Sequence, residues 1–120
     1  MKKHPVIHFE IGCHQGEKTR DFFTGLFGWE ISGPEAGFMI NTGGGISGHL
    51  SELGPEWGNY VTVYVEVEDV DLYLKKASEL GGKTLVPPVH LPGQGTFAWL
   101  GAPEGNILGI WKPEKSAPEE

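Results

Sequence analysis

Apolar and polar residues alternate in two stretches of the chain, residues 6–11 and residues 60–67. A period of two residues is typical of a β-strand with one buried and one exposed face. The longer stretch is rich in valine and tyrosine, which favour strands. We therefore predict one strand near the N-terminus and a second at mid-chain. The face opposite the apolar residues carries His8 and Glu10 in the first strand, and Thr62 and Tyr64 in the second.

A helical period follows each strand. Residues 17–27 place their apolar side chains on one stripe, and Gly28 is a suitable helix stop. Residues 70–80 form the second such segment, with Asp69 as a plausible N-cap residue. The apolar positions are Phe22, Phe23, Leu26 and Phe27 in the first helix, and Leu72, Leu74, Ala77 and Leu80 in the second.

Three shorter strands separated by turns follow each helix, so both halves read β-α-β-β-β. The alternative is a generic α+β sandwich whose halves match by chance. We expect one domain over residues 1–120: module one at about 5–51, a connector at 52–59, module two at about 60–112, and a tail at 113–120. The short strands are predicted at 29–31, 37–40, 46–50, 83–86, 96–100 and 106–111.

Composition narrows the class of protein. The 120 residues carry 9 basic and 16 acidic side chains, a net charge of −7, which argues against a nucleic-acid partner. The single cysteine, Cys13, cannot form an internal disulfide, which favours a reducing compartment. No apolar run approaches the ~20 residues that span a bilayer, and the N-terminus does not read as a secretory signal. A soluble, cytoplasmic protein is expected.

Five motifs occur in an order and spacing that resemble the vicinal oxygen chelate superfamily, which includes glyoxalase I, extradiol dioxygenases and bleomycin-resistance proteins. The resemblance covers residues 7–111. It implies an α+β fold in which two β-α-β-β-β modules form a curled mixed sheet around a ligand cavity, with the helices outside. It also implies a homodimer. The motifs are IHFEI (7–11), FFTGLFGWE (22–30), VYVEVEDVD (63–71), ASELGGK (77–83) and PEGN (103–106).

The chemistry of that family usually depends on a divalent metal ion held by four strand residues, two from each module. Aligned with this pattern, the first module offers His8 and Gly48, and the second offers Thr62 and Gly109. Histidine is a competent ligand, threonine is a poor one, and glycine has no side chain. We therefore expect no cofactor and a metal-free cavity. A one-residue shift of register would instead present His49, and a His8/His49 pair helped by Glu10 would suit a divalent metal.

The predicted ligand-binding residues are His8, Glu10, Thr62, Tyr64 and Trp111. Four of them have a plainer alternative: a solvated strand face for His8 and Glu10, filling of the sheet for Tyr64, and core filling or a dimer contact for Trp111. Trp99 is expected to fill the core or to form a dimer contact, and His90 to lie in a loop. No catalytic residue is assigned.

Three functions follow from the resemblance. The first is a small-molecule-binding protein without the standard metal site, a class that includes sequestration of bleomycin-type cations. The second is a divalent-metal-dependent lyase, isomerase or dioxygenase of the glyoxalase type that uses His8 and His49. The third is a dimer-interaction module with a vestigial pocket. One fold hosts many chemistries, so the resemblance does not choose among them.

Overall fold

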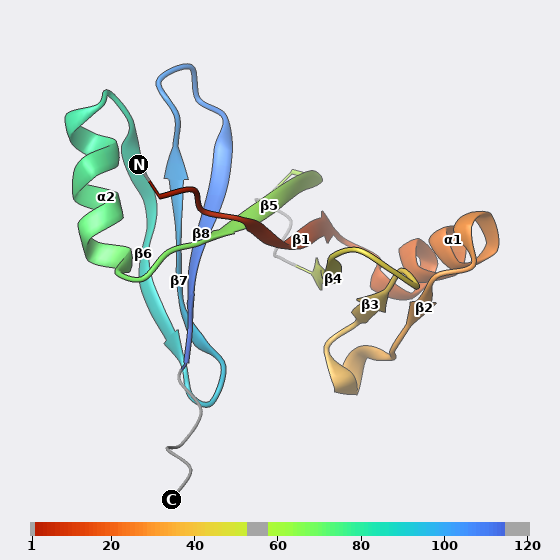
Figure 1. Cartoon of the computed structure of the whole chain (residues 1–120). Helices are drawn as coiled ribbons and strands as arrows, with labels where there is room; N and C mark the ends of the chain where they lie inside the picture. Colours follow the sequence, from red (N-terminus) through yellow and green to blue (C-terminus); the bar gives the residue numbers. More distant parts are fainter. Residues whose placement is uncertain (1, 53–57, 115–120) are drawn as a thin grey trace, which may run out of the picture. The chain divides into compact units, whose positions relative to one another are not determined.

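The computed structural model describes residues 2–52 and 58–114 (Figure 1). Contacts divide the chain into a first unit, residues 7–63, and a second unit, residues 1–6 and 64–120. The strands are β1 (Val6–Cys13), β2 (Glu30–Ile31), β3 (Met39–Asn41), β4 (Ser47–Glu52), β5 (Tyr60–Glu66), β6 (Lys83–Leu91), β7 (Gly95–Gly101) and β8 (Ile107–Pro113). The helices are α1 (Gly16–Phe27), α2 (Val70–Glu79) and a 3-10 turn, η1 (Pro34–Ala36).

The first unit is built on the strand order β2-β3-β4-β1. β1 and β4 run parallel, whereas β2–β3 and β3–β4 are antiparallel. One face of these strands holds a small core, because the apolar positions of the alternating pattern all point that way. The core consists of Cys13, Phe38, Ile40 and Leu50, with Phe9, Ile11, Trp29 and Ile31 packed against it.

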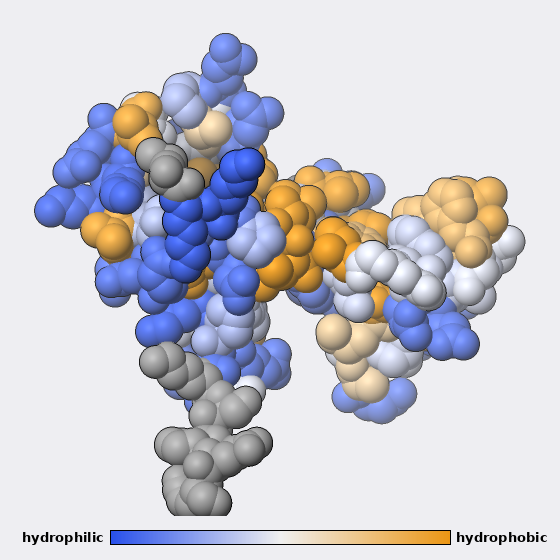
Figure 2. Space-filling model, viewed as in Figure 1, coloured by the Kyte–Doolittle hydropathy of each residue, from blue (hydrophilic) through white to orange (hydrophobic). Residues whose placement is uncertain are grey.

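The two ends of helix α1 are stabilised in different ways. Gln15 at its start makes no side-chain cap, but the Glu52 carboxylate accepts a hydrogen bond from the Gly16 amide at 2.6 Å. At its end Gly28 adopts a left-handed conformation (φ 72°), which glycine tolerates without steric cost. The predicted apolar stripe is largely exposed: Phe22, Leu26 and Phe27 are each more than half accessible. Apolar surface accordingly lies over α1 in Figure 2.

The second unit has the strand order β5-β8-β7-β6. β5 and β8 are parallel, and the other two pairs are antiparallel. Helix α2 begins at Asp69, whose carboxylate accepts a hydrogen bond from the Leu72 amide at 3.0 Å, as the sequence predicted. The core against this helix contains Val67, Val70, Leu74, Ala98 and Ile110.

The prediction that His90 lies in a loop is wrong, because His90 belongs to strand β6. The strand runs through Pro87 and Pro88 to Leu91, and His90 pairs in register with Thr96 of β7. Among residues 2–52 and 58–114, β6 is the last strand of the order and pairs only with β7. Prolines, which lack an N–H donor, are tolerated on such an edge, and the pairing register shifts around them.

The α+β class and the two β-α-β-β-β modules are confirmed. Residues 53–57 of the predicted connector and 115–120 of the predicted tail lie outside the described residues. The curled arrangement of both modules around one cavity stays a prediction. Within the part of the chain that the structure describes, neither helix has the length and hydropathy needed to cross a membrane.

Candidate functional site

Two histidines meet on the face of the first unit that is turned away from its core. In the parallel pairing of β1 with β4, Glu10 lies opposite His49, and residues opposite one another share a face. His8, two positions before Glu10, shares it too. The Nε2 atom of His8 lies 2.7 Å from Nδ1 of His49, a hydrogen bond between two imidazoles.

The carboxylate of Glu10 is buried beside His49. Glu10 is only 4% exposed, and its Oε1 lies 3.7 Å from Nε2 of His49. Its other oxygen accepts a hydrogen bond from the hydroxyl of Tyr60 on β5. We call His8, His49, Glu10 and Tyr60 the polar cluster. All four residues belong to the first unit.

The donor and acceptor in the His8–His49 hydrogen bond depend on which ring nitrogens carry hydrogen. With the hydrogen of His49 on Nε2, toward the Glu10 carboxylate 3.7 Å away, Nδ1 of His49 accepts and Nε2–H of His8 donates. Burial is the main cause that lowers the pKa of both histidines, although the Glu10 charge opposes it. Burial and the hydrogen bond to Glu10 raise the pKa of Tyr60.

The structure corrects the alignment of Gly48 with a ligand position. Gly48 pairs with Phe9 in the β1–β4 register, and a Cβ atom at Gly48 would lie 2.7 Å from the Phe9 ring. Gly48 therefore lies on the core face. His49, one residue further, lies on the face of His8 and Glu10, which is the arrangement that the shifted register predicted.

The remaining predicted residues lie on β5 and β8. Thr62, in the first unit, is 4% exposed. In the second unit Tyr64 and Trp111 come together, with ring centroids 6.2 Å apart. Trp99 is buried, as expected, and its indole N–H donates to the Tyr64 hydroxyl at 2.8 Å.

Sequence reasoning missed Tyr60 and Phe97. Tyr60 has the same parity along β5 as Thr62 and Tyr64, so the alternation itself was the available signal. Phe97 stacks beside Trp111 because β7 and β8 pair these two residues in register. That partnership depends on the register between β7 and β8, which the alternation within each strand does not give.

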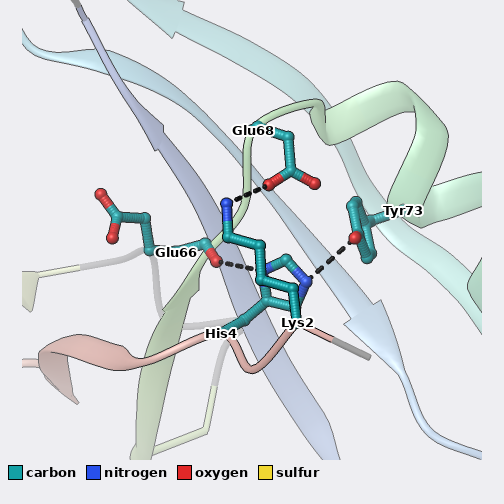
Figure 3. A network of polar contacts seen from close by, with 5 residues as sticks. All are labelled: Lys2, His4, Glu66, Glu68 and Tyr73. Atoms are coloured by element: carbon teal, nitrogen blue, oxygen red, sulfur yellow. Dashed lines mark hydrogen bonds and ion pairs between the residues drawn. The ribbon is translucent and has the colours of Figure 1, made fainter.

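Within the second unit, a further network joins Lys2 and His4 to the region of β5 and α2 (Figure 3). His4 contacts the Glu66 carbonyl oxygen at 3.1 Å and the Tyr73 hydroxyl at 2.9 Å. Lys2 forms an ion pair with Glu68 at 3.1 Å. A surface hollow of about 480 Å³ adjoins these residues. All residues that line this hollow belong to the second unit.

The side chains can be tested against the four-ligand metal centre of the resembled family. The first unit supplies two converging imidazoles, His8 and His49. The aligned positions of the second module, Thr62 and Gly109, supply a hydroxyl and no side chain. Among the described residues, no group of three or more His, Cys, Asp or Glu side chains is placed to hold a metal ion. These residues do not fit the four-ligand centre.

No family model matches the sequence, and the curated proteins that match it include the following two. The anthracycline biosynthesis protein DnrV of Streptomyces peucetius is 27% identical over 126 residues, covering 87% of this chain and 45% of the relative. "Putative glyoxylase CFP32" of Mycobacterium tuberculosis is 34% identical over 68 residues, covering 57% and 26%. The chain thus spans less than half the length of either relative.

Solved structures show the same fold. Hypothetical protein BH1468 from Bacillus halodurans superposes with a TM-score of 0.70 at 16% identity, covering 98% of this chain and all of that one. Methylmalonyl-CoA epimerase from Streptomyces coelicolor, in complex with 2-nitronate-propionyl-CoA, gives 0.63 at 18% identity, covering 98% and 100%. Identities this low show the fold alone.

The fold with its duplicated modules is the fold of these solved structures. Together with the sequence relatives, it places the chain in the vicinal oxygen chelate superfamily, to which this chain belongs. The resemblance of the sequence motifs is thereby confirmed.

Proposed function

We propose that this chain is a small-molecule-binding protein of the superfamily that holds its ligand by hydrogen bonds from the polar cluster. The observation that carries the proposal is the 2.7 Å contact between His8 and His49, supported by Glu10 and Tyr60. The two facing nitrogens hydrogen-bond to each other. The cluster thus presents an ordered set of hydrogen-bond donors and acceptors to an organic ligand.

The burial of these groups supports a binding role. A buried carboxylate is costly unless it is hydrogen-bonded, and Glu10 is 4% exposed with partners on two sides. His49 keeps 27% of its side chain accessible, so part of the cluster can reach a ligand. Ligand sites commonly combine a few placed polar groups with apolar walls.

The names of the relatives agree with small organic ligands. DnrV is named for anthracycline biosynthesis, and CFP32 is named as a glyoxylase. Neither name assigns a substrate to this chain, which matches less than half of each relative. They support a search among small oxygenated and aromatic compounds.

A thermal-shift screen of small aromatic compounds and antibiotics tests the proposal. A ligand that binds the folded state raises the melting temperature by mass action. We expect hits that His8→Ala and His49→Ala abolish. His90→Ala is the matched control, since His90 pairs with Glu114 on the second unit. Hits that persist in both cluster variants, or no hits at all, would contradict the proposal. The latter result would favour the vestigial dimer-interaction module.

The second candidate is a divalent-metal-dependent lyase, isomerase or dioxygenase that uses His8 and His49. It is favoured by one observation: imidazoles from adjacent parallel strands converge on one point. Elemental analysis of protein purified without a histidine tag separates the candidates. A stoichiometric Ni, Zn, Fe or Mn ion that disappears in His8→Ala would favour the enzyme over the binding protein.

A further inference from the structure

The second unit carries a pair of parallel aromatic rings on the sheet face opposite α2. Phe97 of β7 and Trp111 of β8 are direct partners in the antiparallel register. Their ring centroids are 6.1 Å apart, and their planes differ by 12°. Both side chains are half-buried. The two rings are therefore stacked on one face of the sheet, and we call them the aromatic pair.

Buried aromatic side chains brace the aromatic pair. The Tyr64 ring meets Phe97 at 87° and Trp111 at 81°, both close to perpendicular. Edge-to-face contacts of this kind are favourable because the positive ring edge meets the negative ring face. The Trp99 indole N–H donates to the Tyr64 hydroxyl at 2.8 Å, and both residues are 4% exposed. The aromatic pair is thus held in position before any ligand arrives.

A carboxylate lies at one side of the aromatic pair. Glu66 of β5 is the parallel partner of Trp111, so its side chain leaves the sheet on the same face. Across β5, β8 and β7, the side chains on this face are therefore the Glu66 carboxylate, the Trp111 indole and the Phe97 phenyl ring. The chain as a whole carries a net charge of −7, which attracts cations to its surface.

We propose that the aromatic pair stacks a planar aromatic ligand that carries a cationic amino group, with Glu66 facing that group. The inference rests on the proposed small-molecule-binding function and names its ligand class. Flat π-systems stack on aromatic side chains. The carboxylate gives a preference for the cation over neutral and anionic rings of the same shape.

Three acridines provide a matched set of probes: 9-aminoacridine as the cation, acridine as the neutral compound, and acridine-9-carboxylate as the anion. We expect 9-aminoacridine to bind the full chain saturably at one site in calorimetric titration. Trp111→Ala should weaken that binding about tenfold or more, and Trp111→Phe by much less. Trp29→Phe is the control, because Trp29 packs on Phe23 in the first unit.

Glu66→Gln tests the charge preference. It should bring the affinity for 9-aminoacridine down toward that for acridine, whereas Glu104→Gln, in an exposed turn, should leave the preference unchanged. Phe97→Leu is the second variant if Trp111→Ala does not fold, as judged by its melting transition. Absence of saturable binding, full affinity in the aromatic variants, or equal binding of cation and anion would each overturn the inference.

The failure of this inference can be told from the failure of the proposed function. If screen hits depend on His8 but acridines do not bind, the ligand class is wrong and the binding function stands. If acridine binding depends on Trp111 but no hit depends on the polar cluster, the proposed role of that cluster is wrong.

Discussion

At residue 109 the backbone of β8 has no room for a side chain. A Cβ atom at Gly109 would lie 2.3 Å from Cδ1 of Tyr64, which is buried and bonded to Trp99. We therefore predict that Gly109→Ala lowers the free energy of unfolding by about 1 to 3 kcal/mol. Urea denaturation measures it. Gly44→Ala is the control, because its Cβ meets open space, and equal stability of the two variants would contradict the account.

The histidines of the polar cluster make the free energy of unfolding depend on pH. Burial lowers the pKa of His8 and His49 below 6.5. In the unfolded chain the two histidines therefore take up protons at a higher pH than in the folded chain. Their contribution to the free energy of unfolding is complete above about pH 6.5 and is lost as the pH falls. We expect a decrease in unfolding free energy between about pH 7.5 and about pH 5.5.

The double variant His8→Asn/His49→Asn should flatten this pH dependence, whereas His90→Asn should retain it. Chemical denaturation at the two pH values provides the comparison. Stability that is constant, or that rises toward acid pH in the unmodified chain, would show that the two imidazoles are not held neutral by burial.

Individual residues also show which parts of the candidate site could be predicted from the sequence. Alternation placed His8 and Glu10 on one strand face, and the structure agrees. Alignment put Gly48 on that face as well, which is wrong, because a shift of one residue exchanges the faces of a strand. The contact between His8 and His49 depends on the register of β1 with β4. Local patterns do not encode that register.

Among the elements, the ends of the helices were the most predictable features. Asp69 caps α2 through the Leu72 amide, as its position before an apolar period indicated. Asp69→Ala should lower the unfolding free energy by about 1 kcal/mol. Asp71→Ala, in the first turn but outside this cap, should cost only a few tenths of a kcal/mol. Thermal and urea unfolding measure both, and the reverse order would refute the capping role.

The two helices differ in how much of their apolar stripe they bury. Leu74 of α2 is 8% exposed, whereas Leu26 of α1 is 58% exposed. Leu74→Ala should therefore destabilise the chain by about 2 to 4 kcal/mol, and Leu26→Ala by less than about 1 kcal/mol. Denaturant midpoints of the two variants test this contrast. Equal losses would mean that α1 is buried in solution.

Strand β6 shows why some elements could not be predicted. Pro87 and Pro88 argue against a strand, and sequence reasoning ended the strand at residue 86. The sheet accepts these prolines because, in the part of the chain that the structure describes, β6 is an edge strand that pairs with β7. Whether a strand lies at an edge depends on the topology, and the topology depends on contacts between distant residues.

For the whole molecule, the repeated β-α-β-β-β order and the superfamily followed from the sequence, because five short motifs in order leave few alternatives. The homodimer and the cytoplasmic location stay predictions. The function of the relatives does not transfer as a whole, since this chain spans 45% of DnrV and 26% of CFP32. The proposed function therefore depends on the chain's own polar cluster.

Nitrogen NMR of the imidazole rings, recorded with and without one equivalent of Zn²⁺, distinguishes a hydrogen-bonded histidine pair from a metal site. We expect neutral rings in both residues, with Nε2–H of His8 hydrogen-bonded to Nδ1 of His49, and no change on adding the metal. If both nitrogens moved together to metal-bound shifts at one equivalent, the pair would be a metal site, and the binding function proposed for it would be wrong.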